Sequence, residues 1–326
     1  MMKIAISELR AVCLKILKKR GLNTDQALLI FNEYLDAELS GKSHHGFHSF
    51  PEYAVKKIER FRPPKILREE ENLLFIDGAK NLGQIVCHKF VPKLIAKAKK
   101  RNIAMMGIVN MHSYQMPGTY ARLAAENNLV AFIFNYGGAP RIAPFGSIDP
   151  VFGSNPIAIG VPGKDFPVVV DMATAKRAMM VVRKALKLGK RLLPGLAIDK
   201  KGKPTTDPAA AIEGALLPFG GYKGSALALV TEILTKTMFG INPQDKTKAN
   251  RGYLFIFFNP AAFTKIGLFK SRVSSLARHI KQSRKAMGVK EIFLPGERAE
   301  GLRRKNKNRT YINLDPAILG EIRSLL

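Results

Sequence analysis

Cysteine is scarce in this sequence: only Cys13 and Cys87 occur among 326 residues, each amid apolar neighbours. Two isolated thiols of this kind favour reduced, buried cysteines in a cytoplasmic protein over a disulfide-stabilised one. The sequence also has no uncharged apolar run of about 18 residues, the length that a membrane-spanning helix needs. Residues 1–21 are amphipathic and carry charges throughout, which argues against a secretory signal peptide. We therefore expect a cytoplasmic protein without a membrane partner.

Three common ligand-binding signatures are missing as well. No GxGxxG or GxxxxGK[ST] motif occurs, so neither a Rossmann domain nor a P-loop is supported by motif. No CxxC pair is present to hold zinc. His44 and His48 have the i,i+4 spacing of two metal ligands on one helix face, but Gly46 weakens such a helix and no third ligand is fixed. We therefore predict no metal site.

Acidic residues are few. The chain has 53 Lys and Arg against 25 Asp and Glu, a formal net charge of +28. Such a charge attracts nucleic acid, phosphorylated cofactors or carboxylate substrates, although a solvated basic surface explains it equally well. No nucleic-acid recognition motif is present, and aromatic residues are not interleaved with the basic clusters. Nucleic acid is therefore not the expected partner, and polyanion binding stays as an alternative.

Helical patterns dominate the first 60 residues. Leu9, Val12 and Leu17 recur on one face of a helix that Ser7 is expected to cap, and Thr24 is expected to cap the next helix. The sequence predicts the later helices at residues 82–100, 120–127, 224–238 and 260–281, a polar loop at 242–250, and a last helix starting at Asp315 and Pro316.

Strand patterns begin after about residue 72 and alternate with the helices. Such alternation indicates an α/β or α+β protein built around a layered sheet. The chain is long enough, at 46% hydrophobic residues, for one large domain or two intertwined ones. The strands are expected at residues 73–76, 103–109, 130–135, 157–161, 168–171, 253–258 and 292–294.

Two segments have the residue types of an anion or ligand site. Glycines at 220, 221 and 224 let backbone N–H groups approach a ligand, and the helix that follows adds its positive N-terminus and Lys223. Asp171 ends an apolar strand, where a carboxylate commonly contacts a ligand or caps a helix. A tight turn with an exposed lysine is the plainer interpretation of the first segment, and a simple helix cap that of the second.

Taken in order, the motifs of the chain resemble those of a known family. They are GxxxHG with a downstream Pro-x-Tyr, LGQ, an Asn-containing loop after a strand, APFG, GSNP, VDMAT, PTTDP, LLPFGGYKG and LPGER. This order resembles the malate/L-lactate dehydrogenase family of NAD(P)-dependent oxidoreductases, which includes sulfolactate, ureidoglycolate and diketogulonate enzymes. The resemblance covers about residues 3–325 and is most specific at 143–156, 170–174 and 216–224.

The resemblance implies a fold, a reaction and an assembly. The fold is a non-Rossmann mixed α/β sheet with a helical lobe formed from both chain ends. Residues 1–115 and 265–326 would form the substrate and dimerisation lobe, and residues 116–264 the NAD(P)-binding domain of a homodimer. The reaction moves hydride between nicotinamide and a small 2-hydroxy or 2-oxo acid. The positions that match cofactor-binding residues are Ala139, Pro140, Pro144, Asp171, Met172, Ala173, Lys223, Gly296, Glu297 and Arg298.

The substrate end departs from the family pattern. The anchors Gly41, Gly46, Pro51 and Tyr53 fix a gapless register in which the family's serine falls on His44 and its histidine on His45. The family's arginine, which grips the substrate carboxylate, falls on Ser49. A neutral serine cannot make the two charge-assisted hydrogen bonds that an arginine makes. We expect His44 and His48, when protonated, to supply part of the missing charge, with Ser49 and Tyr53 beside the substrate.

The proton-donor loop is altered too. The family's donor histidine falls on Ser113, and a histidine occurs one residue earlier, at His112. A serine hydroxyl cannot replace imidazole as a general acid and base. We predict His45 and His112 as the proton-handling pair, with Ser113 at the family position. The alternative is a catalytically lapsed homologue that binds the cofactor, nucleic acid or another polyanion.

Overall fold

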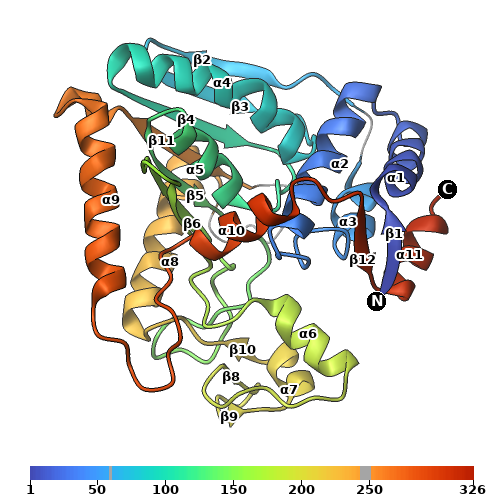
Figure 1. Ribbon diagram of the computed structural model, residues 1–326. Helices are drawn as coiled ribbons and strands as arrows, with labels where there is room; N and C mark the ends of the chain where they lie inside the picture. The colour runs from blue at the N-terminus through green and yellow to red at the C-terminus, as the bar shows by residue number, and fades with distance from the viewer. Residues whose placement is uncertain (59–60, 243–250) are drawn as a thin grey trace.

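The computed structural model describes residues 1–58, 61–242 and 251–326, and its centre is a seven-stranded mixed sheet (Figure 1). Only β3 and β4 pair in parallel, and every other neighbouring pair is antiparallel. This mixed sheet confirms the predicted non-Rossmann fold class. Across the sheet the strands are β2 (Lys65–Glu69), β3 (Leu73–Asp77), β4 (Ile103–Val109), β11 (Tyr253–Phe258), β5 (Val130–Asn135), β6 (Ile157–Val161) and β7 (Val168–Met172).

Two helices cover one face of this sheet. α4 (Gly83–Arg101) packs on β4 and β11, and α5 (Pro117–Glu126) packs on β5, β6 and β7. Side chains alternate along a strand, so every second residue of β4, such as Met106, enters the core beneath these helices. The opposite face meets α8 (Tyr222–Thr235) and the short helix η2 (Thr237–Phe239), where Phe239 contacts Phe75.

The helical lobe is built from both chain ends, as predicted. Its core cluster joins α1 (Ile6–Lys19), α2 (Thr24–Leu39), α3 (Phe50–Tyr53) and α11 (Pro316–Arg323). β1 (Met2–Ala5) and β12 (Tyr311–Leu314) form an antiparallel pair that the sequence analysis does not predict. Figure 1 shows this pair joining the blue and red ends of the chain.

A smaller three-stranded sheet lies beside the main one (Figure 1). The elements of this part and the remaining helices are η1 (Val55–Lys57), α6 (Met179–Lys187), β8 (Ala197–Ile198), β9 (Pro204–Thr205), α7 (Pro208–Glu213), β10 (Ala215–Leu216), η3 (Pro260–Ala262), α9 (Ile266–Gln282) and α10 (Glu297–Asn306).

Three local predictions are wrong. α1 begins after Ala5, so Ser7 does not cap it. Asn23 caps α2 in place of Thr24, because its side chain and that of Gln26 bond each other's backbone N–H groups. Residues 292–294 form no strand, since only the last of them is buried and the segment pairs with no strand.

Other local predictions are confirmed. Asp315 caps α11 through the N–H of Ala317. Cys13 and Cys87 are free and buried. The predicted loop at 242–250 lies, after its first residue, outside the described residues. Within the ranges that the structure describes, no helix combines the length and the apolar character needed to cross a bilayer.

Candidate active site

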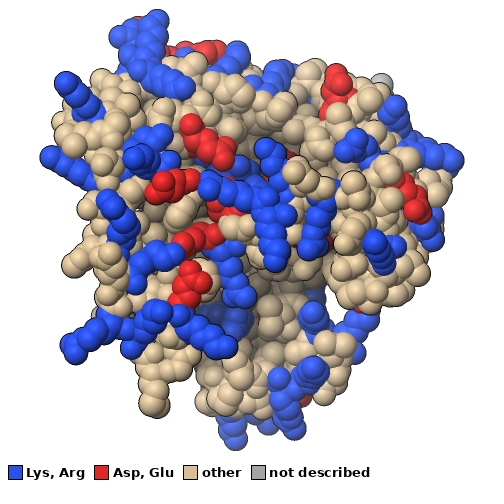
Figure 2. Space-filling view, viewed as in Figure 1, with Lys and Arg blue, Asp and Glu red and all other residues tan. Residues whose placement is uncertain are grey.

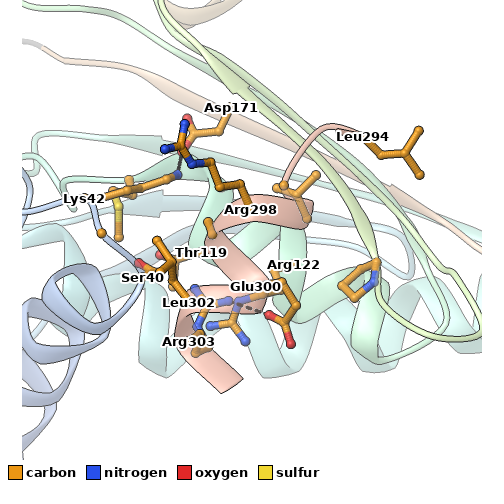
Figure 3. A pocket seen from close by; sticks show the side chains of 17 residues that line it. Ser40, Lys42, Thr119, Arg122, Asp171, Leu294, Arg298, Glu300, Leu302 and Arg303 are labelled. Carbon is orange, nitrogen blue, oxygen red and sulfur yellow. Dashed lines mark hydrogen bonds and ion pairs between the residues drawn. The ribbon is translucent and has the colours of Figure 1, made fainter. Parts of the chain in front are cut away.

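A cleft of about 520 Å³ lies where the end of α2, the start of α5, β7 and the start of α10 meet (Figure 3). Its charged lining has more bases than acids, which suits an anionic ligand. These charged residues are Lys42, Arg122, Asp171, Arg298, Glu300 and Arg303.

Lys42 enters the cleft from the turn that ends α2. The N–H of Lys42 donates to the carbonyl of Ala37 (2.8 Å), and the N–H of Gly41 donates to that of Glu38 (3.0 Å). This pattern is a Schellman turn, which needs a left-handed residue, and Gly41 supplies it with a φ of +75°. A Cβ at Gly41 would also lie 2.7 Å from Leu302 of α10. The glycine therefore directs the chain so that Lys42 faces the cleft.

Asp171 is the partner of Lys42. The Nζ of Lys42 donates to the Oδ2 of Asp171 at 2.9 Å, and both side chains are partly buried. Asp171 lies near the end of β7, beside the N-terminus of α5. A Cβ at Gly118 would lie 2.6 Å from Oδ2, so only glycine lets this helix end approach so closely. The carboxylate therefore lies against the positive end of α5.

Arg298 reaches the same pair from α10. The turn before this helix is held on β7, where the N–H of Val169 donates to the carbonyl of Pro295 (3.1 Å). Gly296 has a φ of +83° and packs directly against Val169. Figure 3 shows the Arg298 side chain extending toward Lys42 and Asp171. Among the described residues, no carboxylate lies within ion-pair distance of Arg298, so its charge is available to a ligand.

The other end of the cleft is electrically balanced. Arg303 donates to both carboxylate oxygens of Asp36 (2.6 and 3.0 Å) and to Glu300 (2.6 Å). Arg122 donates to Glu126 at 2.7 Å. Arg298 is thus the cation best placed for an anionic ligand, and Lys42, whose ammonium group is shared with Asp171, lies beside it (Figure 3).

A second, much smaller cavity of about 10 Å³ adjoins the cleft, and Met116 and Thr119 line both. His45 is in its wall and is largely buried. Burial, with the nearby charges of His44 and Lys42, lowers the pKa of His45 to about 4, although Asp171 and a hydrogen bond to Gln115 oppose this shift. His45 is therefore neutral at pH 7. The other residues around the cavity are Glu33, Tyr34, Gln84, Tyr114 and Gln115.

His44 and His48 differ in what they contribute. The rings of His44 and His45 are 4.4 Å apart. Burial first, and then the charge of Lys42, lowers the pKa of His44, which works against the predicted positive charge at this position. His48 lies elsewhere, with its Nδ1 3.9 Å from Glu38, and it lines neither cavity.

The Ser49 side chain is buried, and its hydroxyl bonds other groups of the protein. Its hydroxyl donates to the carbonyl of Gly46 (3.0 Å) and lies 3.4 Å from the Oε1 of Gln115. Neither Ser49 nor Tyr53 lines the cleft or the small cavity. The polar group that enters the cleft from this part of the chain is Lys42, which the sequence analysis did not single out.

The loop between β4 and α5 presents Gln115 to His45. Gln115 has a φ of +68° and hydrogen-bonds the His45 side chain. Ser113 turns inward along the loop, where its Oγ accepts the N–H of Gln115 (3.1 Å). The backbone N–H of His112 donates to Asn81 (2.9 Å), and His112 lines neither cavity. Tyr114 belongs to the core and donates to Asn135.

The predicted cofactor segments are neighbours in space. The N–H of Ala143 donates to Leu216 (3.1 Å), which links residues 139–144 to the glycine turn. The N–H of Phe219 donates to Thr174 (3.0 Å), which links that turn to the chain after Asp171, Met172 and Ala173.

Lys223 and Glu297 have different surroundings within this group. Lys223 is exposed at the start of α8, after Gly220 and Gly221, both with φ near +60°. Glu297 closes its own turn, because its carboxylate accepts the N–H of Leu294 (2.9 Å) and the Lys281 ammonium.

Comparison with known proteins identifies the family of the chain. The family model for malate/L-lactate dehydrogenase matches residues 4–323, so the chain belongs to this family. The members of the family use NAD or NADP.

Individual relatives resemble the chain over almost its whole length. It is 34% identical to the L-sulfolactate dehydrogenase of Methanocaldococcus jannaschii, over 97% of this chain and 94% of the relative. It is 29% identical to the (2R)-3-sulfolactate dehydrogenase (NADP(+)) of Chromohalobacter salexigens, over 98% and 97%. The solved structure of the sulfolactate dehydrogenase from M. jannaschii matches with a TM-score of 0.88 and 33% identity, over 99% and 96% of the two chains.

Proposed function

We propose that the protein is an NAD(P)-dependent oxidoreductase that interconverts a small 2-hydroxy acid and its 2-oxo acid, with an altered substrate site. The observation that carries the proposal is the meeting of Lys42, Asp171 and Arg298 in one cleft, beside the buried and neutral His45. Family membership supports the reaction class.

Lys42 takes over the charge of the missing arginine. A 2-oxo acid brings a carboxylate, and the cleft offers Lys42 to bind it, whereas Ser49 is buried and its hydroxyl is bonded to Gly46. An ammonium group acts as a point charge and does not grip a carboxylate with two parallel bonds. The altered site therefore accepts anionic groups of more varied shape, including a sulfonate such as that of sulfolactate, on which relatives act.

His45 provides the proton at the reacting oxygen. Reduction of a carbonyl carbon leaves charge on its oxygen, and a positioned acid is worth about 10²–10⁴-fold in rate. A bound nicotinamide supplies the hydride. His45 is neutral, so one ring nitrogen can donate while the other accepts, and Gln115 lies beside it in the wall of the small cavity. His112, the predicted partner of His45, and Ser113, at the family's donor position, line neither cavity.

The residues around Asp171 and Lys223 fit a dinucleotide. The two left-handed glycines of the 218–224 turn, the start of α8 and the exposed Lys223 ammonium form a basic seat for phosphate or ribose groups. We assign cofactor binding to these segments and to the turn at Gly296. The matching positions are Ala139, Pro140, Pro144, Asp171, Met172, Ala173, Lys223, Gly296, Glu297 and Arg298.

Two parts of the chain have different roles in the proposed assembly. Residues 116–264 contribute most of the cofactor seat, and residues 1–115 with 265–326 contribute the substrate and dimerisation lobe. The main sheet takes strands from both ranges, so these are functional parts of one fold. We propose a cytoplasmic homodimer.

A lapsed homologue that binds a polyanion is the second candidate. The observation in its favour is the net charge of +28, and Figure 2 shows Lys and Arg spread over the visible face. The spread over this face, with no single basic groove in view, supports a solvated surface more than a nucleic-acid track.

A screen of 2-oxo acids with NADH and NADPH tests the two candidates. We expect oxidation of the reduced cofactor with at least one small 2-oxo acid, followed by absorbance. Lys223→Ala should weaken cofactor binding by about 1.5–3 kcal/mol if the ammonium makes a charge-assisted hydrogen bond. Binding without turnover for every acid would favour the lapsed homologue, and equal binding by Lys223→Ala would show that the cofactor lies elsewhere.

A further inference from the structure

The small cavity beside His45 has the size and the polarity of a water site. Its volume of about 10 Å³ is close to the ~10–15 Å³ that one water molecule needs. Two buried side-chain atoms in its wall lack a hydrogen bond of good geometry: the Tyr34 hydroxyl, which lies near Ser49 and Gln115, and the Oε1 of Gln84. Buried polar atoms are nearly always satisfied by protein or water. One water in this cavity would satisfy both.

Glu33 is another polar group of the same wall, and the reaction outlined above does not use it. It precedes Tyr34 on α2, and its Oε1 accepts the hydroxyl of Tyr120 from α5 at 2.8 Å. Burial is the main reason that its pKa is raised to about 8, and Asp36 on its own helix raises it further. The Tyr120 bond and the charge of Arg122, both from α5, oppose this shift, and Cys87 of α4 also faces it.

We propose that Glu33 holds the proton that this site delivers and passes it to His45 through a water bound by Tyr34 and Gln84. The proposal rests on the proposed function. It gives the site an internal acid where the family's donor position is Ser113, whose Oγ is occupied by the N–H of Gln115.

In the direction of reduction, one hydride and a series of proton transfers reach the substrate. The substrate C2 gains a hydride from the nicotinamide, and its oxygen takes a proton from one ring nitrogen of His45. The other ring nitrogen takes a proton from the water, and the water takes one from the Glu33 carboxyl. His45 ends neutral, Glu33 ends as a carboxylate, and solvent returns its proton before the next turnover. Glu33 does not touch the substrate and acts on it only through His45.

Glu33→Gln removes the proton and keeps an oxygen for the Tyr120 hydroxyl. We expect kcat for reduction to fall about 10²-fold or more with little change in KM. The parent's kcat should decline as the pH rises through about 8, because the protonated carboxyl is required, and Glu33→Gln should lack this decline. Glu71→Gln, an exposed glutamate paired with Arg101, is the matched control and should leave rate and pH profile unchanged. A Glu33→Gln enzyme with the parent's rate and profile would overturn the proposal.

Spectroscopy of the whole protein tests the relay without turnover. An infrared band of a protonated carboxyl should disappear near pH 8 and be absent from Glu33→Gln. The ¹⁵N signals of the His45 ring should shift at the same pH in the parent and not in the variant. A His45 ring that ignores the titration of Glu33, or a Glu33 already ionised at pH 7, overturns the relay. A protein that reduces no 2-oxo acid yet shows the linked titration would contradict the proposed function and support the proton connection between Glu33 and His45.

Discussion

Lys42 acts on three neighbouring groups at once. It donates to Asp171, and its charge adds to burial in lowering the pKa of His44 and of His45. A cation at this position therefore does two things: it attracts an anionic substrate and lowers the pKa of both neighbouring imidazoles. Ser49, in the family's arginine position, does neither, because its hydroxyl is bonded to Gly46.

Removing this charge tests the substrate anchor. Lys42→Met should raise KM for a 2-oxo acid about 10- to 100-fold, since a hydrogen bond to a charged group is worth about 1.5–3 kcal/mol. The pKa of both His44 and His45 should rise in the same variant, which NMR titration would detect. Lys56→Met is the matched control: Lys56 is exposed and pairs with Glu52 on the surface, so KM should not change. An unchanged KM in Lys42→Met would place the substrate carboxylate elsewhere.

The neutral state of His45 makes stability depend on pH. The pKa of His45 falls from 6.5 to about 4 on folding, so the unfolded chain binds the proton more tightly. This contribution to the free energy of unfolding is complete above pH 6.5 and is lost as the pH falls toward 4. His45→Asn should therefore flatten the decline of Tm below pH 6.5, measured by thermal unfolding. His279→Asn, at an exposed position of α9, should leave that decline as in the parent.

At the scale of elements, the cleft depends on glycines that let helices and strands approach closely. Gly41 turns the chain after α2, Gly118 admits Asp171 to the start of α5, and Gly296 packs on β7. Any other residue at these three positions would strain the backbone or place its Cβ too close to a neighbouring atom. The elements themselves are ordinary, and the glycines between them determine where the charged side chains meet.

Gly41→Ala tests this at the α2 turn. An alanine there would adopt a φ of +75° and place its Cβ 2.7 Å from Leu302. We expect a loss of about 1–3 kcal/mol in the free energy of unfolding, together with a raised KM because Lys42 is displaced. Gly301→Ala, inside α10 with no atom within 4 Å of its Cβ, should instead stabilise the protein by about 0.5–1 kcal/mol. Equal effects of the two changes would contradict this account.

Local patterns predicted most strands and helices, because apolar periodicity and helix caps depend on residues close together in the sequence. The pairing of β1 with β12 was missed because it joins residues some 300 positions apart, and nothing local marks it. The apolar character of residues 292–294 predicts a strand, although two of the three residues are not buried.

The candidate site was predicted only in part. The motif alignment gave His45, His112, Ser113 and Asp171, and the structure places His45 in the wall of the small cavity and Asp171 in the cleft. The approach of Lys42 to Asp171, and of Gln115 to His45, follows from a helix-ending turn and a left-handed loop residue. Such contacts depend on three-dimensional geometry, which spacing alone does not specify.

At the scale of the whole molecule, the net charge of +28 surrounds a cleft whose charged lining also has more bases than acids. Exposed like charges repel one another and destabilise the compact state, and salt screens them over about 10 Å at 0.1 M. The same field draws anionic substrates toward the cleft. The charge therefore assists the proposed reaction without implying a nucleic-acid partner.

Binding to DNA at different salt concentrations separates these two roles of the charge. We expect any affinity to fall steeply between about 50 and 200 mM salt, as counterion release requires, and to be the same for unrelated sequences. Tm should rise over the same range of salt, because screening relieves the repulsion between exposed Lys and Arg. Fluorescence anisotropy with two duplexes of scrambled sequence would measure the first effect, and thermal unfolding the second. Tight binding of one preferred sequence at about 150 mM salt would contradict the prediction, because a field of spread charges follows the phosphate backbone and cannot read bases.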